Sequence, residues 1–435
     1  MLEFFKLKER NTTISREIIG GISTFLAMVY VLALVPSMLK ETGQVSFEAA
    51  FSGVAIATAA ATLIMAFWAN LPVALSSGIG PSVFLVYGVV IGLGISWQSA
   101  LAAIFIEGVV FVLLSYFGIR EAIIKALPKS LQNAIAVGIG LFITLIALSN
   151  AGIVSNAQGT IIGFAPFNNP SVLLAVFGIL ISIVLYTMRV RGAILLGIVA
   201  TTILGIIFGA IVLPQNFSAL SSPSVPMFLA MDFSVVFNKE FFMVFFMLLF
   251  LDLFNTIGTL VGVANAANLL DKEGKMPKLK EALLSDAAGT CVGASFGAPT
   301  ITSYIESGAG VAAGAKTGLA SVVTGILFLF ALFLAPLFAL VPHFALTGAL
   351  VLVGYLMMKS ISKIDFSDKS EGIPAFVTII VMPFAYDIVA GMAWGVIAYT
   401  LCKCASGNSK QISLATWILT LLFIAKIVYD ICVLG

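Results

Sequence analysis

The side chains best suited to bind a ligand gather in residues 297–310, Gly-Ala-Pro-Thr-Ile-Thr-Ser-Tyr-Ile-Glu-Ser-Gly-Ala-Gly. Pro299 and three glycines interrupt an apolar run here, and several hydroxyl side chains precede the carboxylate of Glu306. Those hydroxyls belong to Thr300, Thr302, Ser303 and Tyr304. Proline ends a preceding helix and is tolerated in the first turn of a new one, so a half-helix is expected to start at Pro299. Because a helix break at membrane depth must be buried in protein or line a cavity, we predict half of a substrate site here.

A second polar group lies on the apolar segment 241–264. Asp252, Asn255, Thr256 and Thr259 follow the spacing i, i+3, i+4, i+7 and would form one polar stripe on a helix. Ionisable groups in a membrane span are costly and usually face the interior of the bundle. A carboxylate there can accept hydrogen bonds from the N–H groups of a heterocycle, or take up a proton.

A third polar group interrupts the apolar segment 75–92. It comprises Ser76, Ser77, Gly78, Gly80, Pro81 and Ser82. Backbone N–H groups near Ser82 and Thr300 are predicted to face a ligand's acceptors. Phe254, Phe84 and Phe25 are aromatic side chains that could stack on a flat ligand, and the sequence does not select among them.

The composition of the chain excludes a soluble protein. Of 435 residues, 60% are hydrophobic and only 10% are charged, whereas soluble chains carry about 25% charged residues. Repeated apolar runs of about 20 residues predict an all-α polytopic membrane protein. No long polar domain is present, so the function must reside in the membrane part.

The apolar runs and the positive charges together predict a topology. The runs lie at 18–39, 47–69, 75–92, 98–118, 131–150, 171–189, 192–213, 241–264, 281–297, 299–312, 317–341, 344–362, 372–404 and 411–433. The run 372–404 is too long for one span, and Tyr386-Asp387 is expected to divide it. With the N-terminus in the cytoplasm, 17 of the 22 basic residues fall on the inside and two, Lys40 and Lys239, fall outside up to the twelfth span. About 14 spans result, and 411–433 could add a fifteenth.

An internal repeat is consistent with this count. Leu127-Pro128 with later glycines resembles Val341-Pro342 at an offset of 214 residues, and Gly80-Pro81-Ser82 resembles Ala298-Pro299-Thr300 at an offset of 218. Seven spans separate the members of each pair, so the two halves would be inverted. Paired broken helices in inverted halves indicate a transporter's midplane site.

The remaining reactive side chains have simpler interpretations. Glu107 and Asp286 are also intramembrane acids, for which a structural hydrogen bond between helices is the simpler interpretation. His343 is the only histidine and follows a proline at a helix junction. The cysteines Cys291, Cys402, Cys404 and Cys432 lack zinc-site spacing and a histidine partner, so we expect reduced thiols, no metal and no cofactor.

Several long motifs occur in order along the chain. They are Glu17-Ile-Ile-Gly-Gly-Ile-Ser-Thr-Phe-Leu-Ala-Met-Val-Tyr30, Trp97-Gln98-Ser99-Ala100-Leu101-Ala102-Ala103, Ile106-Glu107-Gly108, Asn255-Thr256-Ile257-Gly258-Thr259-Leu260-Val261-Gly262-Val263-Ala264, Thr302-Ser303-Tyr304-Ile305-Glu306-Ser307 and Gly314-Ala315-Lys316-Thr317-Gly318-Leu319. Together these motifs resemble the AzgA-like purine permeases of the nucleobase and ascorbate transporter superfamily. The resemblance runs nearly from end to end. It implies a 7+7 inverted repeat in the cell membrane, with a short strand and a half-helix in each of spans 3 and 10.

The resemblance also implies a division of the chain and a set of site residues. The expected parts are a cytoplasmic basic arm (1–17), a core domain (18–118 and 241–341), a gate domain (119–240 and 342–404) and a C-terminal apolar helix (405–435). A purine base would bind between spans 1, 3, 8 and 10, with uptake driven by a cation, usually protons. The substrate-binding residues would be Glu306, Asn255, Ser82, Thr300, Thr302, Thr259, Phe254 and Phe84, and the proton-coupling residues Glu306 and Asp252. The expected partners are the base, protons and the lipid bilayer, and no nucleic acid is expected. Whether the protein forms a homodimer is left open.

The sequence departs from the family's pattern at polar positions. The family's acidic residue on span 8 is Asn255 here, which cannot ionise but can donate to and accept from a base edge. The usual Gly-Met-Gly-Leu-Asn-Ala of span 3 reads Gly78-Ile79-Gly80-Pro81-Ser82-Val83, the Asn-Pro of span 1 reads Val35-Pro36, and a customary threonine is Ala27. Proton coupling would then fall to Glu306 or Asp252.

The leading hypothesis is therefore a secondary active transporter that imports adenine, hypoxanthine or guanine, and not an enzyme. One alternative keeps the scaffold with another small planar substrate or with uncoupled uptake. An intramembrane enzyme is disfavoured because the chain has no H-E-x-x-H motif and no nucleophile with a nearby histidine. A channel fits paired broken helices with a buried acid less well than a carrier does.

Overall fold

The computed structural model divides the chain into two compact units, each described by itself. Unit 1 comprises Met1–Gly118 and Pro166–Ala349, and unit 2 comprises Ile119–Ala165 and Leu350–Gly435. The described residues are 3–117, 128–157, 160–165, 169–190, 192–213, 217–235, 241, 244, 245, 248, 249, 252, 256, 259, 260, 263, 264, 267, 269, 276 and 278–434. The division of the chain into a moving core and gate stays a prediction.

Unit 1 is built mainly of helices. In chain order its described elements are α1 (Ile14–Met28), α2 (Val31–Glu41), α3 (Phe47–Trp68), β1 (Leu75–Ser77), α4 (Ile79–Val83), the π-helix η1 (Phe84–Gly92), α5 (Trp97–Tyr116), α8 (Pro170–Thr187), α9 (Ala193–Ile207), η2 (Phe233–Val235), α11 (Leu279–Ser295), β4 (Ile301–Ser303), α12 (Ser307–Ala312), α13 (Gly318–Ala331), η3 (Leu332–Leu334), α14 (Ala335–Ala339) and the first part of α15 (His343–Met358). Thr13, Ser46 and Ser96 cap α1, α3 and α5 with side-chain oxygens, which explains where these helices begin.

Unit 2 contains the rest of α15 and a smaller helical group. Its described elements are α7 (Lys129–Asn150), β2 (Val154–Ala157), β3 (Thr160–Phe164), η4 (Lys359–Lys363), α16 (Lys369–Phe384), α17 (Ile388–Ala405), η5 (Ser409–Gln411) and α18 (Leu414–Leu434). The predicted break at Tyr386-Asp387 is confirmed, because α16 ends at Phe384 and α17 begins at Ile388. The antiparallel β2–β3 hairpin was not predicted from the sequence.

The protein is a multi-pass membrane protein by the length and apolar character of its helices. Among the described residues, seven helices are long and apolar enough to cross a membrane. They are Ile14–Glu41, Phe47–Trp68, Trp97–Tyr116, Lys129–Asn150, Pro170–Thr187, Gly318–Ala339 and His343–Lys363. Shorter apolar helices, such as Ala193–Ile207, lie beside them in the sequence. The count of about 14 spans stays a prediction.

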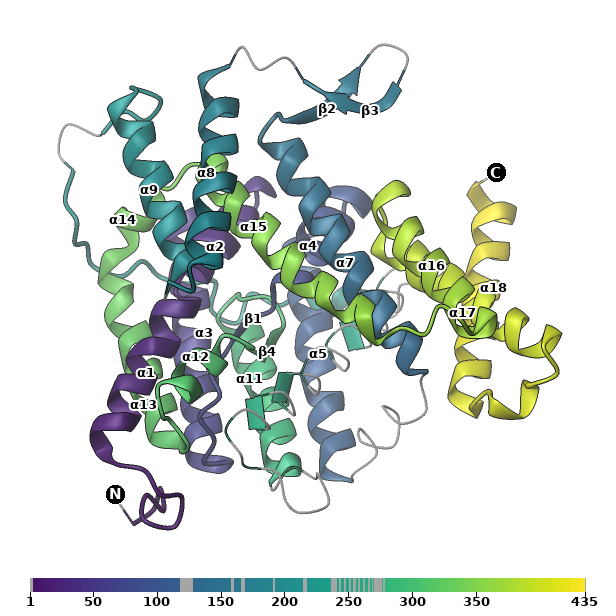
Figure 1. The fold of residues 1–435 in the computed structure, drawn as a ribbon, viewed down its shortest axis with the longest axis horizontal. Coiled ribbons are helices and arrows are strands. Elements are labelled where there is room, and N and C mark those ends of the chain that lie inside the picture. Colours follow the sequence, from purple (N-terminus) through teal and green to yellow (C-terminus); the bar gives the residue numbers. More distant parts are fainter. Residues whose placement is uncertain are drawn as a thin grey trace. The chain divides into compact units, whose positions relative to one another are not determined.

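The predicted strand and half-helix elements of spans 3 and 10 are confirmed. β1 and β4 pair antiparallel, with Ser76 opposite Thr302, and lie side by side between α3 and α11 (Figure 1). Further backbone hydrogen bonds extend the pairing, from Gly78 N to Thr300 O (3.0 Å) and from Tyr304 N to Ala74 O (3.0 Å). Two backbone segments that cannot form helix bonds thereby satisfy each other.

Threonine hydroxyls satisfy the outer edges of this two-stranded ribbon. On the β1 side, the Thr62 hydroxyl of α3 bonds to both the N–H and the carbonyl of Leu75, each at 3.0 Å. On the β4 side, the Thr290 hydroxyl of α11 donates to the carbonyl of Ile301 at 2.9 Å. These hydroxyls take the place of neighbouring strands, which explains how so short a ribbon exists inside an apolar bundle.

Two details of the predicted breaks differ in the structure. The expectation that a half-helix begins at Pro299 is wrong, because strand β4 follows this proline and α12 begins only at Ser307. Glu306 is therefore the residue that immediately precedes the half-helix. The first span is also interrupted, at Val29 and Tyr30 between α1 and α2, although no proline or glycine marks this position.

Close packing of α1 on α12 depends on glycine. A Cβ atom at Gly310 would collide with the hydroxyl of Thr24 and the carbonyl of Gly20, both on α1. By contrast, a Cβ atom at Gly308, on the same half-helix, would meet nothing within 4 Å. The position of α12 against α1 is therefore fixed by backbone contact at Gly310.

We predict that Gly310→Ala lowers stability and Gly308→Ala does not. The added methyl at position 310 must push α12 away from α1, which costs about 1–3 kcal/mol in a well-packed interior. The measurement is thermal unfolding of both variants in the same detergent. Equal melting temperatures for the two variants would contradict this account of the α1–α12 contact.

Candidate functional site

The carboxylate of Glu306 is held by a tyrosine at the junction of α1 and α2 in the first span. The Tyr30 hydroxyl donates to Oε1 of Glu306 at 2.7 Å, and Tyr30 itself is fully buried. Glu306 is only partly covered within the protein, and its side chain makes no capping hydrogen bond to α12. A carboxylate accepts several hydrogen bonds, so Glu306 can accept from Tyr30 and from a ligand at the same time.

Polar groups surround Glu306 on the chain that leads into α12. The Tyr304 hydroxyl donates to the carbonyl of Ser77 on β1 at 2.5 Å, and the Ser307 hydroxyl accepts from Ala74 N at 3.0 Å. Immediately before Tyr304 in the sequence, the buried hydroxyl of Ser303 has no hydrogen-bond partner among the described residues. Since an unpaired buried hydroxyl costs free energy, Ser303 is a candidate to bind a ligand.

Thr300 connects the ribbon to a buried acid of the fourth span. Its hydroxyl donates to Oε2 of Glu107 on α5 at 3.0 Å, and both residues are fully buried. The Thr300 carbonyl accepts from Gly78 N, where the backbones approach so closely that a Cβ atom on Gly78 would lie 2.6 Å from Cγ2 of Thr302. Glu107 was interpreted as a hydrogen-bond partner of another helix, whereas Thr300 lies in the segment between α11 and β4, and this contact fixes the start of β4.

A second buried acidic group joins the eighth span to α11 and β4. The Thr256 hydroxyl lies 3.1 Å from Oδ1 of Asp252 and 3.1 Å from both carboxylate oxygens of Asp286. It also lies 3.0 Å from the hydroxyl of Thr302. All four residues are buried. The Thr256 hydroxyl therefore connects the two buried carboxylates to the strand β4.

The remaining predicted site residues are Ser82, Phe84, Thr259, Asn255 and Phe254. The Ser82 backbone N–H and its hydroxyl both bond to the carbonyl of Gly78, at 2.9 and 2.6 Å, so they are engaged within α4. Phe84 is buried at the start of η1, and a Cβ atom on Gly88 would touch its ring. Thr259 is buried. Asn255 and Phe254 lie outside the described residues.

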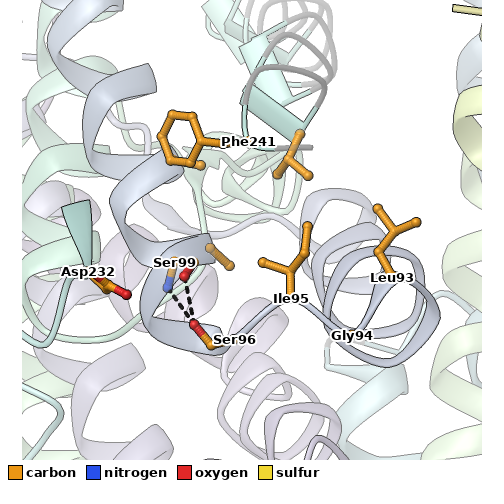
Figure 2. Close-up of a pocket in the computed structure, with 10 residues that line it drawn as sticks. Leu93, Gly94, Ile95, Ser96, Ser99, Asp232 and Phe241 are labelled. Atoms are coloured by element: carbon orange, nitrogen blue, oxygen red, sulfur yellow. Dashed lines mark hydrogen bonds between the residues drawn. The ribbon is translucent and has the colours of Figure 1, made fainter. Parts of the chain in front are cut away.

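A cavity of about 490 Å³ lies apart from these residues, at the start of α5. Figure 2 shows Ser96 and Ser99 joined by hydrogen bonds there, with Phe241, Ile95 and Leu93 as apolar neighbours and Asp232 to one side. Asp232 is partly exposed, and hydrogen bonds from Ser234 hold the pKa of Asp232 below its usual value. None of the predicted site residues lines this cavity.

Sequence reasoning missed two residues of the arrangement. Tyr30 lies in a recognisable motif, but nothing in its apolar neighbours indicates that its hydroxyl reaches a residue 276 positions away. Asp286 was interpreted as a structural group, and its connection to Thr256 across two helices could not be read from spacing. In the described part of the chain, no group of three or more His, Cys, Asp or Glu side chains is arranged to bind a metal.

Interrupted helices around a central strand pair are the distinguishing feature of this membrane-protein fold. The fold is similar to the solved transmembrane domain of BicA, a cyanobacterial bicarbonate transporter. The TM-score is 0.65 at 15% sequence identity, over 86% of this chain and 97% of that one. At this identity the likeness shows a common fold alone.

The chain belongs to the Permease family Xan_ur_permease, which matches residues 15–394. It is 38% identical over 431 residues to the adenine permease AdeP of Escherichia coli, covering 99% of this chain and 96% of AdeP. It is 37% identical over 439 residues to the guanine/hypoxanthine permease PbuG of Bacillus subtilis, covering 99% of this chain and 100% of PbuG. This protein is therefore a transmembrane permease.

We predict that Thr256→Val destabilises the folded protein, whereas Thr256→Ser does not. Valine keeps the shape but removes the hydroxyl that two buried carboxylates share, and the loss of a hydrogen bond to a charged group costs about 1.5–3 kcal/mol. Thermal unfolding of the two purified variants measures the difference. If Thr256→Val and the wild type had the same melting temperature, the hydrogen bonds of this hydroxyl to Asp252 and Asp286 would not stabilise the protein.

Proposed function

We propose that this permease is a secondary active transporter that imports a purine nucleobase across the cell membrane. The names of its full-length relatives, an adenine permease and a guanine/hypoxanthine permease, support this substrate class. The observation that carries the proposal is the Glu306 carboxylate at the break before α12, held at 2.7 Å by Tyr30 and only partly covered. Such a group can accept hydrogen bonds from the N–H groups of a purine.

In the proposed binding mode, Glu306 accepts hydrogen bonds from the base while Tyr30 keeps its carboxylate oriented. The Ser303 hydroxyl, unpartnered among the described residues, contributes a further hydrogen bond to the base edge. Asn255 supplies an amide that both donates and accepts. Thr300 and Thr302 support the site by holding β4, and Ser82, Thr259, Phe84 and Phe254 complete its proposed lining.

The proposed driving force is a proton gradient. Glu306 is one candidate to carry the proton, and Asp252 is the other. Asp252 shares the Thr256 hydroxyl with Asp286, so two buried carboxylates lie around one hydroxyl. Binding of one proton within this group relieves their repulsion. Because the same hydroxyl lies 3.0 Å from Thr302 on β4, uptake of a proton there would affect the strand that precedes Glu306.

The transport cycle is proposed to follow alternating access, in which a core carrying the base moves against a gate. The cytoplasmic N-terminus follows from the distribution of Lys and Arg and is part of the proposal.

We predict that Glu306→Gln weakens binding of hypoxanthine and adenine about 10- to 100-fold, the range expected when a hydrogen bond to a charged group is lost. Tyr30→Phe should weaken it too, because the carboxylate loses its orienting donor. Equilibrium binding to purified protein gives the affinities. Tyr304→Phe is the matched control, since its hydroxyl donates to a backbone carbonyl rather than to Glu306. Unchanged affinity in Glu306→Gln and in Asn255→Ala would refute the proposed site.

We predict saturable uptake of radiolabelled hypoxanthine or adenine into proteoliposomes, accelerated by an inward proton gradient. Of the two variants Asp252→Asn and Glu306→Gln, the one that lacks the proton-coupling carboxylate should no longer take up the base faster in the gradient. If the rate of uptake by the wild type does not depend on the proton gradient, the protein is an uncoupled carrier. Absence of uptake by folded protein would indicate another small planar substrate.

A further inference from the structure

The N-terminal residues 3–13, here called the N-terminal strap, fold back onto unit 1. Although the strap is basic, its Phe5 side chain is fully buried and packs near Phe67 of α3, with ring centroids 5.9 Å apart. Arg10 donates from Nη1 to two carbonyls, those of Asn70 and Lys316, each at 2.7 Å. Burial lowers the pKa of Arg10, and the negative charge of Glu17 opposes that shift.

Asn70, in the turn after α3, connects three segments. Its side chain donates to the carbonyl of Phe5 at 3.3 Å and accepts from Gly318 N at 2.8 Å, while its own carbonyl accepts from Arg10. Asn70 has a left-handed backbone (φ 53°), a conformation that asparagine tolerates better than most residues. The strap, the end of α3 and the start of α13 therefore meet at one buried side chain.

Glu17 of α1 completes the connection to the loop that follows α12. Its carboxylate is fully buried and accepts from Lys316 N at 2.9 Å, Thr317 N at 3.2 Å and the Thr12 hydroxyl at 2.8 Å. These backbone N–H groups lie immediately before α13, where the helix itself provides no carbonyl partners. A carboxylate here is also favoured by the positive end of the helix dipole.

The chain segments on both sides of Glu306 are attached to the group formed by Arg10, Asn70 and Glu17. Towards the C-terminus, Ala315 N donates to the carbonyl of Gly310 on α12, one residue before Lys316. Towards the N-terminus, β4 pairs with β1, and the segment between Asn70 and β1 is held by the Ser321 hydroxyl of α13, which lies 2.7 Å from the carbonyl of Leu71. With only six residues, α12 has little stability of its own and takes its position from these attachments.

We infer that Arg10 and Glu17 are positioning residues that set the place of Glu306 through the 313–317 loop and α12, which makes the N-terminal strap part of the transport machinery. Neither side chain needs to touch the substrate. The effect on purine affinity rests on the proposed function, whereas the effect on the position of α12 does not.

The first measurement reports α12 directly and needs no ligand. A single cysteine is placed by Gly308→Cys, where a Cβ atom meets nothing within 4 Å, in a chain whose four native cysteines are replaced by alanine. Arg10→Gln or Glu17→Gln is added, and the rate of reaction with a small membrane-permeant maleimide is measured. Both should raise the rate at least about fivefold, because the loss of a charged hydrogen bond favours local opening.

Matched controls separate the inference from a general effect of charge. Lys6→Gln removes a charge from the same strap, where Lys6 pairs only with the exposed Glu9 at 3.0 Å among its described contacts. Glu48→Gln changes an exposed acid in the first turn of α3. Both should stay within about twofold of the parent rate. If Arg10→Gln does not fold, Arg10→Lys and Thr12→Val take its place and should raise the labelling rate by a smaller factor. Equal rates across all these variants would overturn the inference.

The second measurement is the affinity for hypoxanthine and adenine. If the wild type binds a purine, Arg10→Gln and Glu17→Gln should weaken binding at least about fivefold, and should have no further effect in a Glu306→Gln background. A lower melting temperature with unchanged affinity and labelling rate would reduce the strap to a stabilising role and overturn the inference. If the wild type binds no purine but the labelling rates still differ, the proposed function fails and the strap inference stands.

Discussion

The pairing of β1 with β4 is the constraint on which the rest of this structure depends. Inside an apolar bundle, extended backbone needs hydrogen-bond partners, and each strand finds them in the other strand and in threonines of α3 and α11. The pairing fixes where α4 and α12 begin. It thereby brings a tyrosine of the first span, the carboxylate before α12 and the acids of the neighbouring helices into one region.

Much of this region could be predicted from the sequence, because breaks in an apolar run are visible as residue types. Gly78, Pro81, Pro299 and the hydroxyl-rich stretch before Glu306 marked both broken spans, and Tyr386-Asp387 marked the divided helix. The strands came only from the family resemblance, since three residues are too few to show an alternating pattern. The exact start of α12 was misplaced because proline permits a new helix without requiring one.

Tertiary contacts account for what the sequence did not reveal. The interruption at Val29 and Tyr30 has no local signal, and the hydrogen bond to Glu306 that accompanies it joins distant parts of the chain. The polar stripe of the eighth span was read from spacing, but its partner Asp286 comes from another helix. The charge of the N-terminal strap indicated a cytoplasmic segment, whereas Phe5 and Leu7, which are buried in the structure, were the overlooked signal for docking.

The antiparallel ribbon also has a consequence for the biosynthesis of this protein. Ser77 pairs with Ile301, so 224 positions of chain separate the two partners. During translation, β1 reaches the membrane long before its partner has been made, and its backbone must be accommodated by water, by the insertion machinery or by transient neighbours until then. The ribbon is consequently among the last parts of unit 1 to assemble, and a chain truncated before β4 lacks the pairing partner of β1.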